Sequence, residues 1–62
     1  MPEVKKMEIC MYEKEFTFNG YFVHKESTVE SGEESDEWLV YFNDDTNTYM
    51  YFKLDYIISF TK

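Results

Sequence analysis

The sequence predicts an all-β protein with a five-stranded, strongly bent antiparallel sheet or a small barrel, and with a single helical turn before the last strand. Short runs of alternating apolar and polar residues, separated by turn-forming residues, favour strands. No window of useful length repeats the apolar spacing of an amphipathic helix. Because 62 residues suffice for one domain only, we expect a single small β domain over 1–62, with a flexible N-terminus at 1–5.

The first part of the chain has a period of two. Met7, Ile9 and Met11 alternate with less apolar neighbours, and the segment 15–18 continues the alternation. The apolar phase changes from odd to even positions near 13–14. Because one extra residue in a strand shifts the phase in this way, we expect a bulge or a sharp bend within one long first strand.

A turn and an acidic loop are expected in the next part of the chain. Asn19-Gly20 lies between two aromatic-rich runs, and this pair readily adopts the positive φ angles of a type I′ hairpin turn. The second strand then covers 21–24 and fades towards Val29. From Glu30 to Glu37 the sequence holds five acidic residues and no large apolar one, so we expect a solvated acidic loop over 29–37.

The second half of the chain predicts three further strands and a helical turn. The apolar run 38–42 is rich in strand-forming residues, and the Asn/Asp/Thr cluster 43–47 predicts a hairpin turn to a strand at 48–53. Residues 54–56 fit a single helical turn, and residues 57–61 fit a short final strand. Five short strands joined in this way can curl into a small barrel, which protects the strand edges.

The ending FKLDYIISF at 52–60 resembles the strand, one-turn helix and strand with which SH3-like and Sm-like small barrels finish. The resemblance covers only a short part of the chain and implies an SH3-like fold. It implies no ligand, because many unrelated families share this ending. The sequence shows neither the proline-peptide signature of SH3 domains nor the oligoribonucleotide motifs of Sm-like proteins.

The charge and composition exclude several classes of function. Thirteen acidic residues against six lysines and no arginine give a net charge of -7, which disfavours direct binding to nucleic acid. No apolar stretch is long enough to cross a bilayer, and a single cysteine cannot form an internal disulfide. We therefore expect a cytoplasmic protein that contacts no membrane.

Few residues suit catalysis or metal binding. Cys10 and His24 are the only candidates for zinc ligation or nucleophilic chemistry, and a pair satisfies neither a four-ligand site nor a catalytic triad. The turn 43–47 has oxygen ligands at alternate positions, but Thr48 and Leu54 stand where a calcium loop needs glycine and glutamate. We expect no catalytic residue, no metal and no cofactor.

Some aromatic side chains are expected on the surface, because thirteen aromatic residues exceed what so small a core accommodates. With Met50 and Phe52 directed inwards, Tyr49 and Tyr51 point outwards. On the neighbouring strand we expect Tyr41 to point outwards, with the even-numbered residues of 38–42 directed inwards. The three tyrosines then form an exposed patch that either stabilises the sheet or contacts another protein.

Acidic residues lie on both sides of the strand 38–42. They either keep the protein soluble or, being spread over a strand's length, imitate a row of DNA phosphates. The candidate partner-binding residues are Glu30, Glu33, Glu34, Asp36, Glu37, Asp44, Asp45, Tyr41, Tyr49 and Tyr51.

These features predict a protein-binding module and not an enzyme. The expected partner is a larger protein with a basic surface, such as a nucleic-acid-binding or defence protein, which the carboxylates steer and the tyrosines hold. By size and charge the chain is comparable to the inhibitors that phages and mobile elements encode as mimics of nucleic-acid phosphates. The alternative is a structural β-barrel protomer that assembles into a homodimer or a ring, because its core is small.

Overall fold

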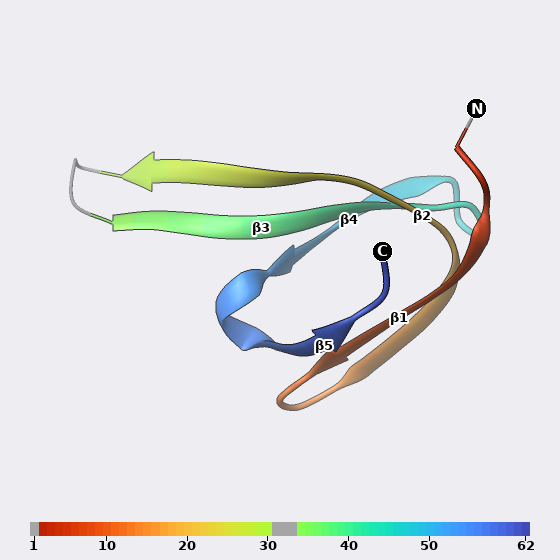
Figure 1. The fold of residues 1–62 in the computed structure, drawn as a ribbon, viewed down its shortest axis with the longest axis horizontal. Coiled ribbons are helices and arrows are strands. Elements are labelled where there is room, and N and C mark those ends of the chain that lie inside the picture. The colour runs from red at the N-terminus through yellow and green to blue at the C-terminus, as the bar shows by residue number, and fades with distance from the viewer. Residues whose placement is uncertain (1, 31–33) are drawn as a thin grey trace.

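The computed structural model describes residues 2–30 and 34–62, which form one antiparallel sheet and a single 3-10 turn. The sheet has five strands, and the helical turn lies directly before the last strand, as the sequence predicts (Figure 1). The elements are β1 (Lys5–Met11), β2 (Glu15–Glu30), β3 (Glu34–Asn43), β4 (Thr48–Lys53), the 3-10 helix η1 (Leu54–Tyr56) and β5 (Ile57–Phe60).

The strands are ordered β4-β3-β2-β1-β5, and every neighbouring pair is antiparallel. The all-β, strongly bent sheet is therefore confirmed. The sheet is not closed, because β4 and β5 are its two edges and do not pair with each other. In Figure 1 the sheet curves so that η1 and β5 lie across from β3.

Asn19-Gly20 marks a bend inside β2 and not a hairpin turn, so the turn predicted there is wrong. Gly20 pairs with Lys5 of β1 and with Asn43 of β3, and β2 passes from one partner to the other at this point. A Cβ atom on Gly20 would overlap the carbonyl oxygen of Phe42. Gly20, which has no Cβ atom, thus allows the backbones of β2 and β3 to approach closely at this corner of the sheet. The chain instead turns at 12–14, where the apolar phase changes, so the one long first strand expected across this point is wrong and consists of two paired strands.

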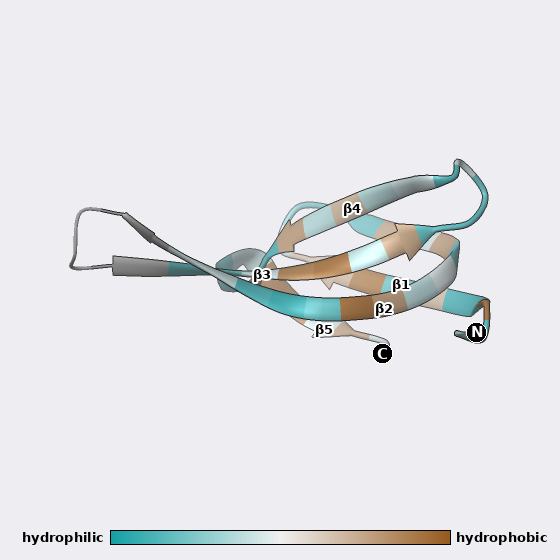
Figure 2. Cartoon of the chain, turned by 90° about the horizontal axis from the view of Figure 1, so that it is seen from above, coloured by the Kyte–Doolittle hydropathy of each residue, from teal (hydrophilic) through white to brown (hydrophobic). Residues whose placement is uncertain are grey.

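The acidic loop expected over 29–37 is largely strand, which corrects that prediction. The pairing of β2 with β3 continues from Lys25 opposite Leu39 to Glu30 opposite Glu34. Only 31–33 lie between the two strands, and they are outside the described residues. Backbone hydrogen bonds extend the ladder through the expected loop, whose paired residues are polar apart from Val29. We call 24–30 and 34–37 the arm. Its outer part, 27–30 paired with 34–37, projects beyond the other strands (Figure 1), and the arm begins with hydrophilic residues on β2 (Figure 2).

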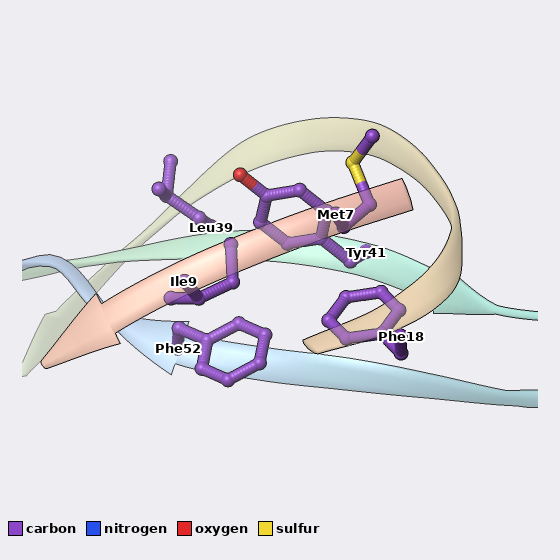
Figure 3. Packing of buried hydrophobic residues seen from close by; sticks show 6 residues of the cluster. All are labelled: Met7, Ile9, Phe18, Leu39, Tyr41 and Phe52. Carbon is purple, nitrogen blue, oxygen red and sulfur yellow. The ribbon is translucent and has the colours of Figure 1, made fainter. Parts of the chain in front are cut away.

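The core lies on the inner face of the bent sheet. Tyr41 packs edge to face against two phenylalanines, with its ring centroid 5.7 Å from that of Phe52 and 5.9 Å from that of Phe18, whereas Phe18 and Phe52 stack on each other. Partly buried side chains, among them Phe16 and Phe22, complete it. The buried cluster consists of Met7, Ile9, Phe18, Leu39, Tyr41 and Phe52 (Figure 3).

Tyr41 is 0% exposed, so the expectation that it points outwards is wrong. Its hydroxyl donates a hydrogen bond to the carbonyl oxygen of Thr61 at 2.6 Å, which satisfies the phenol inside the protein. Burial raises the pKa of Tyr41 to about 12, because the phenolate would lose its hydration. Tyr41 is a core residue whose polar atom fastens the C-terminal segment.

The turn between β3 and β4 follows the expected Asn/Asp chemistry. The side-chain oxygen of Asn43 accepts hydrogen bonds from the backbone N–H groups of Asp45, at 2.9 Å, and Thr46, at 3.2 Å. Asn47 has a φ of 59°, a left-handed conformation that asparagine tolerates. This hairpin joins β3 to β4, the strand that carries the exposed Tyr49 and Tyr51.

Candidate protein-binding face

Tyr49 and Tyr51 lie on the side of the sheet that faces away from the core. They are 62% and 56% exposed, whereas Phe52 is 4% exposed, so the predicted directions along β4 are confirmed. Tyr49 pairs with Phe42 and Tyr51 pairs with Val40 across the β3–β4 ladder. Because residues directly opposite each other share a face, these pairs define one surface, which we call the outer face.

The outer face continues onto β2. The rings of Tyr21 and Phe42 stack with centroids 5.4 Å apart, and Phe42 meets Tyr49 edge to face at 5.3 Å. Val40 is only 1% exposed although it shares this face with the aromatic rings. The outer face therefore carries an ordered aromatic layer, and Tyr51 remains its exposed end towards the arm.

The even-numbered residues of 38–42 lie on the outer face, opposite to the expected direction. They do alternate with Tyr41, as the period of two requires, but Leu39 and Tyr41 take the core side. The run Trp38 to Phe42 is apolar throughout, so hydropathy alone does not define its phase. The pairing with β4 accounts for the observed phase, because Leu39 lies opposite the buried Phe52 and Tyr41 lies opposite Met50.

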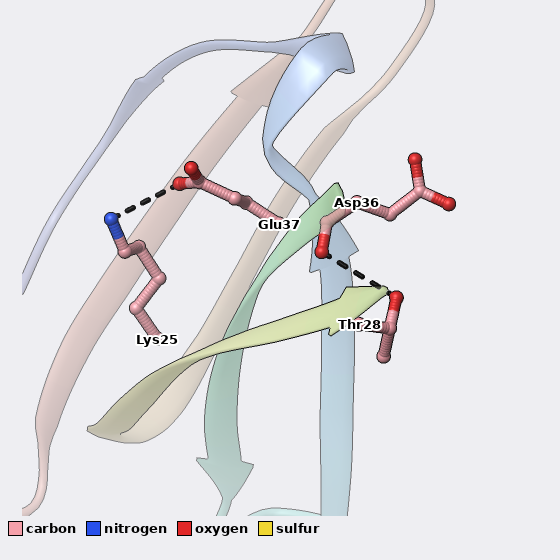
Figure 4. Close-up of polar contacts among 4 residues, drawn as sticks. All are labelled: Lys25, Thr28, Asp36 and Glu37. Carbon is pink, nitrogen blue, oxygen red and sulfur yellow. Dashed lines mark hydrogen bonds and ion pairs between the residues drawn. The ribbon is translucent and has the colours of Figure 1, made fainter. Parts of the chain in front are cut away.

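The acidic residues of the arm do not gather on one side. Asp36 pairs with Lys53 on the outer face at 3.5 Å. Glu37 points to the other side and pairs with Lys25 at 3.0 Å (Figure 4). The side chains of the predicted residues Glu30 and Glu34 lie outside the described part of the structure, as does the whole of Glu33.

The acidic residues after β3 have different roles. Asp44 is exposed, and its backbone N–H donates to the carbonyl oxygen of Asn19 at 2.7 Å. The carboxylate of Asp45 accepts a hydrogen bond from the backbone N–H of Asn19 at 3.0 Å and others from its side-chain amide. These bonds lower the pKa of Asp45. Asp45 therefore holds the corner of β2, and Asp44 is the freer carboxylate.

A hollow of about 410 Å³ lies where the arm leaves the sheet, and we call it the arm hollow. Two carboxylates and two aromatic rings line it together. Sequence reasoning missed Glu26, which lies directly opposite Trp38 across the ladder. Only the pairing of the strands reveals this proximity, because the two residues are far apart in sequence. The lining residues are Glu26, Thr28, Asp36, Trp38 and Tyr51.

A second hollow, of about 470 Å³, lies between the β1–β2 turn and η1. It is lined by Met11, Phe16 and Tyr56, with the ammonium of Lys14 4.9 Å from the centre of the Phe16 ring. The backbone N–H of Tyr12 donates to the carbonyl oxygen of Tyr56 at 3.2 Å, which fixes the turn against η1. This hollow is mostly apolar, and its lining includes one basic and one acidic residue, Lys14 and Glu13.

The residues that suit metal or nucleophilic chemistry are scattered. Cys10 is half-buried on β1 and His24 is exposed on β2. Within residues 2–30 and 34–62, no three side chains of the metal-ligating types lie close enough to share an ion. The same residues contain no helix long and apolar enough to cross a bilayer.

Fold and surface together define a small, open, five-stranded antiparallel sheet with an aromatic outer face and an acidic arm. No protein-family model, curated protein or solved structure matches the chain significantly. The exposed surfaces of the protein are therefore the basis for a functional proposal.

Proposed function

We propose that this protein is a small acidic module that docks its outer face onto a basic surface of another protein. The exposure of Tyr49 and Tyr51 on one face, between the acidic arm and the acidic β3–β4 turn, carries the proposal. Tyrosine gives a large contact area at little entropic cost and keeps a hydrogen-bonding tip. The surrounding carboxylates raise the rate of encounter with a positively charged partner.

Imitation of a phosphate row is the narrower form of this proposal. It needs several carboxylates on one side of the sheet, whereas Asp36 and Glu37 point to opposite sides and each pairs with a lysine of the same chain. The arrangement therefore favours a mixed aromatic and acidic contact. Competition by duplex DNA for the same partner would identify the narrower form.

Capture from a lysate of the source cell, with tagged wild-type protein and a Tyr49→Ser/Tyr51→Ser variant in parallel, tests the proposal. We expect a partner that wild type retains at low salt, that high salt releases and that the variant fails to retain. Tyr12→Ser is the matched control, since Tyr12 is 71% exposed away from the outer face. A partner retained equally by the double variant would contradict the proposal.

Self-assembly is a second candidate, and the open edges of the sheet favour it. β4 has unpaired backbone groups along its outer side, because it is the last strand of the order. Two copies joined there would bury the marginal core better and form one continuous sheet. Sedimentation at micromolar concentration separates the candidates: a dimer that persists at high salt supports self-assembly, and a monomer contradicts it.

A further inference from the structure

We infer that the arm hollow binds an arginine side chain of a partner protein. The inference rests on the proposed function and deepens it, since it names the group that the acidic module recognises and the place where it binds. Three observations support the inference: the charge of the hollow, its aromatic wall and the position of Lys53 beside it.

The charge of the hollow is negative and incompletely compensated. Asp36 has Lys53 as a partner at 3.5 Å, a long distance for an ion pair. Glu26 takes part in no ion pair and no side-chain hydrogen bond within the part of the chain that the structure describes. The two carboxylates come from neighbouring strands and face the same side, so one cation placed between them can contact both.

The aromatic wall selects a flat cation. Trp38 lies directly opposite Glu26, and Tyr51 closes the hollow on the β4 side. A guanidinium group can lie against an indole ring while its N–H groups reach carboxylates at its edge. An ammonium group has no flat face, so a lysine side chain in the same hollow would make less contact with the indole ring.

The protein already places a cation in this chemical setting. The ammonium of Lys53 lies between the carboxylate of Asp36 and the ring of Tyr56, 5.6 Å from the ring centre. Lys53 thus occupies the η1 side of Asp36 and leaves the Glu26 side open. The chain itself contains no arginine, so a guanidinium group must come from another molecule.

A titration of the ¹⁵N-labelled protein with two short peptides tests this inference. The probes are acetyl-Gly-Arg-Gly-amide and its citrulline analogue, which has nearly the same shape without the charge. The chain has a single tryptophan, so its indole N–H signal reports on the hollow directly. We expect the arginine peptide to shift this signal saturably, with a Kd on the order of millimolar, and the citrulline peptide to leave it unchanged.

Two charge-matched variants locate the contact. Glu26→Gln should weaken binding of the arginine peptide roughly two- to fivefold, as expected for a partly exposed ion pair. Glu8→Gln removes the same charge from an exposed site on β1 outside the hollow and should leave the Kd unchanged. Equal shifts with both peptides, or equal weakening by both variants, would overturn the inference.

The outcome is separable from that of the proposed function. If capture of the partner depends on Tyr49 and Tyr51 but the arginine peptide does not shift the Trp38 signal, the proposed docking function stands and the arginine site is refuted. An arginine-specific shift without tyrosine-dependent capture would retain the site and refute the module.

Discussion

The two halves of β3 are stabilised by different interactions. From Leu39 to Asn43 the strand lies between β2 and β4, and most of its side chains are buried. From Glu34 to Glu37 it pairs with β2 alone, and its only described ion pair within the arm is Lys25 with Glu37. The first half is held by apolar burial and the second by backbone pairing, which contributes less to the free energy of folding.

Removing a side chain from the buried half should cause the largest loss of stability. Tyr41→Ala should lower the free energy of unfolding by about 3–5 kcal/mol, because it opens a cavity and removes the bond to Thr61. Tyr51→Ala, on the exposed side of the neighbouring strand, should change it by about 0.5 kcal/mol or less. Urea unfolding followed by circular dichroism measures both, and equal losses would break the comparison.

High pH should destabilise the buried half through the same residue. The folded-state pKa of Tyr41 is about 12, above the value near 10 of an unfolded chain. Its contribution is therefore complete below pH 10 and is lost as the pH rises through 12, by roughly 2–3 kcal/mol in total.

The difference between wild type and Tyr41→Phe isolates this effect, because the phenylalanine ring has no proton to lose. The free energy of unfolding, measured in both proteins from about pH 9 to 12, should fall more steeply with pH in wild type. Parallel curves would contradict the assignment.

The corner at Gly20 should be intolerant of a larger side chain. Gly20→Ala should lower the free energy of unfolding by about 1–3 kcal/mol, because its Cβ overlaps the carbonyl oxygen of Phe42 and the strands must separate. Thr17→Ala, at an exposed position of the same strand, is the control. A melting temperature unchanged by Gly20→Ala would show that the corner yields easily.

Loss of the Asp45 carboxylate should loosen the same corner by a smaller amount. Asp45→Asn replaces an acceptor whose pKa is lowered by the backbone and side-chain N–H groups of Asn19. Because the folded-state pKa is lowered, the carboxylate's contribution to stability is complete above the unfolded-state pKa and is lost as the pH falls through the folded-state pKa. Thermal unfolding at pH 7 should separate wild type from the variant, and the curves should converge in acid.

The ion pair in the arm should have the smallest effect. Lys25 and Glu37 are 54% and 37% exposed, so their coupling in a double-mutant cycle with Lys25→Gln and Glu37→Gln should be below about 1 kcal/mol. The cycle is measured by urea unfolding at low and high salt. A coupling as large as the Tyr41→Ala effect would show that the arm is held like the core.

Most of the fold follows from the sequence, because each strand has a run of strand-forming residues and the 43–47 turn has its own hydrogen-bonding side chains. The turn predicted at Asn19-Gly20 is wrong because the pair suits both a turn and a crowded corner, and only the distant Phe42 distinguishes them. The sequence predicts a loop where the arm lies because most residues there are polar, although a ladder needs only backbone groups.

The candidate site was only partly predictable. The directions of Tyr49 and Tyr51 follow from alternation with Phe52, which is buried. The direction of Tyr41 does not, since it depends on the register that places Tyr41 opposite Met50 of β4 and on a hydroxyl partner twenty residues away. Glu26 enters the site only through pairing with Trp38, a contact that no local pattern encodes.

The hydrogen bond from Tyr41 to Thr61 also bears on the order of folding. β2, β3 and β4 are joined by two hairpins and can pair as soon as residues 15–53 are available. β1 gains its second neighbour only when Ile9 meets Phe60, a contact between opposite ends of the chain. Such distant contacts form slowly. The Tyr41 hydroxyl therefore reaches the Thr61 carbonyl oxygen in a late step of folding, after the hairpins have paired.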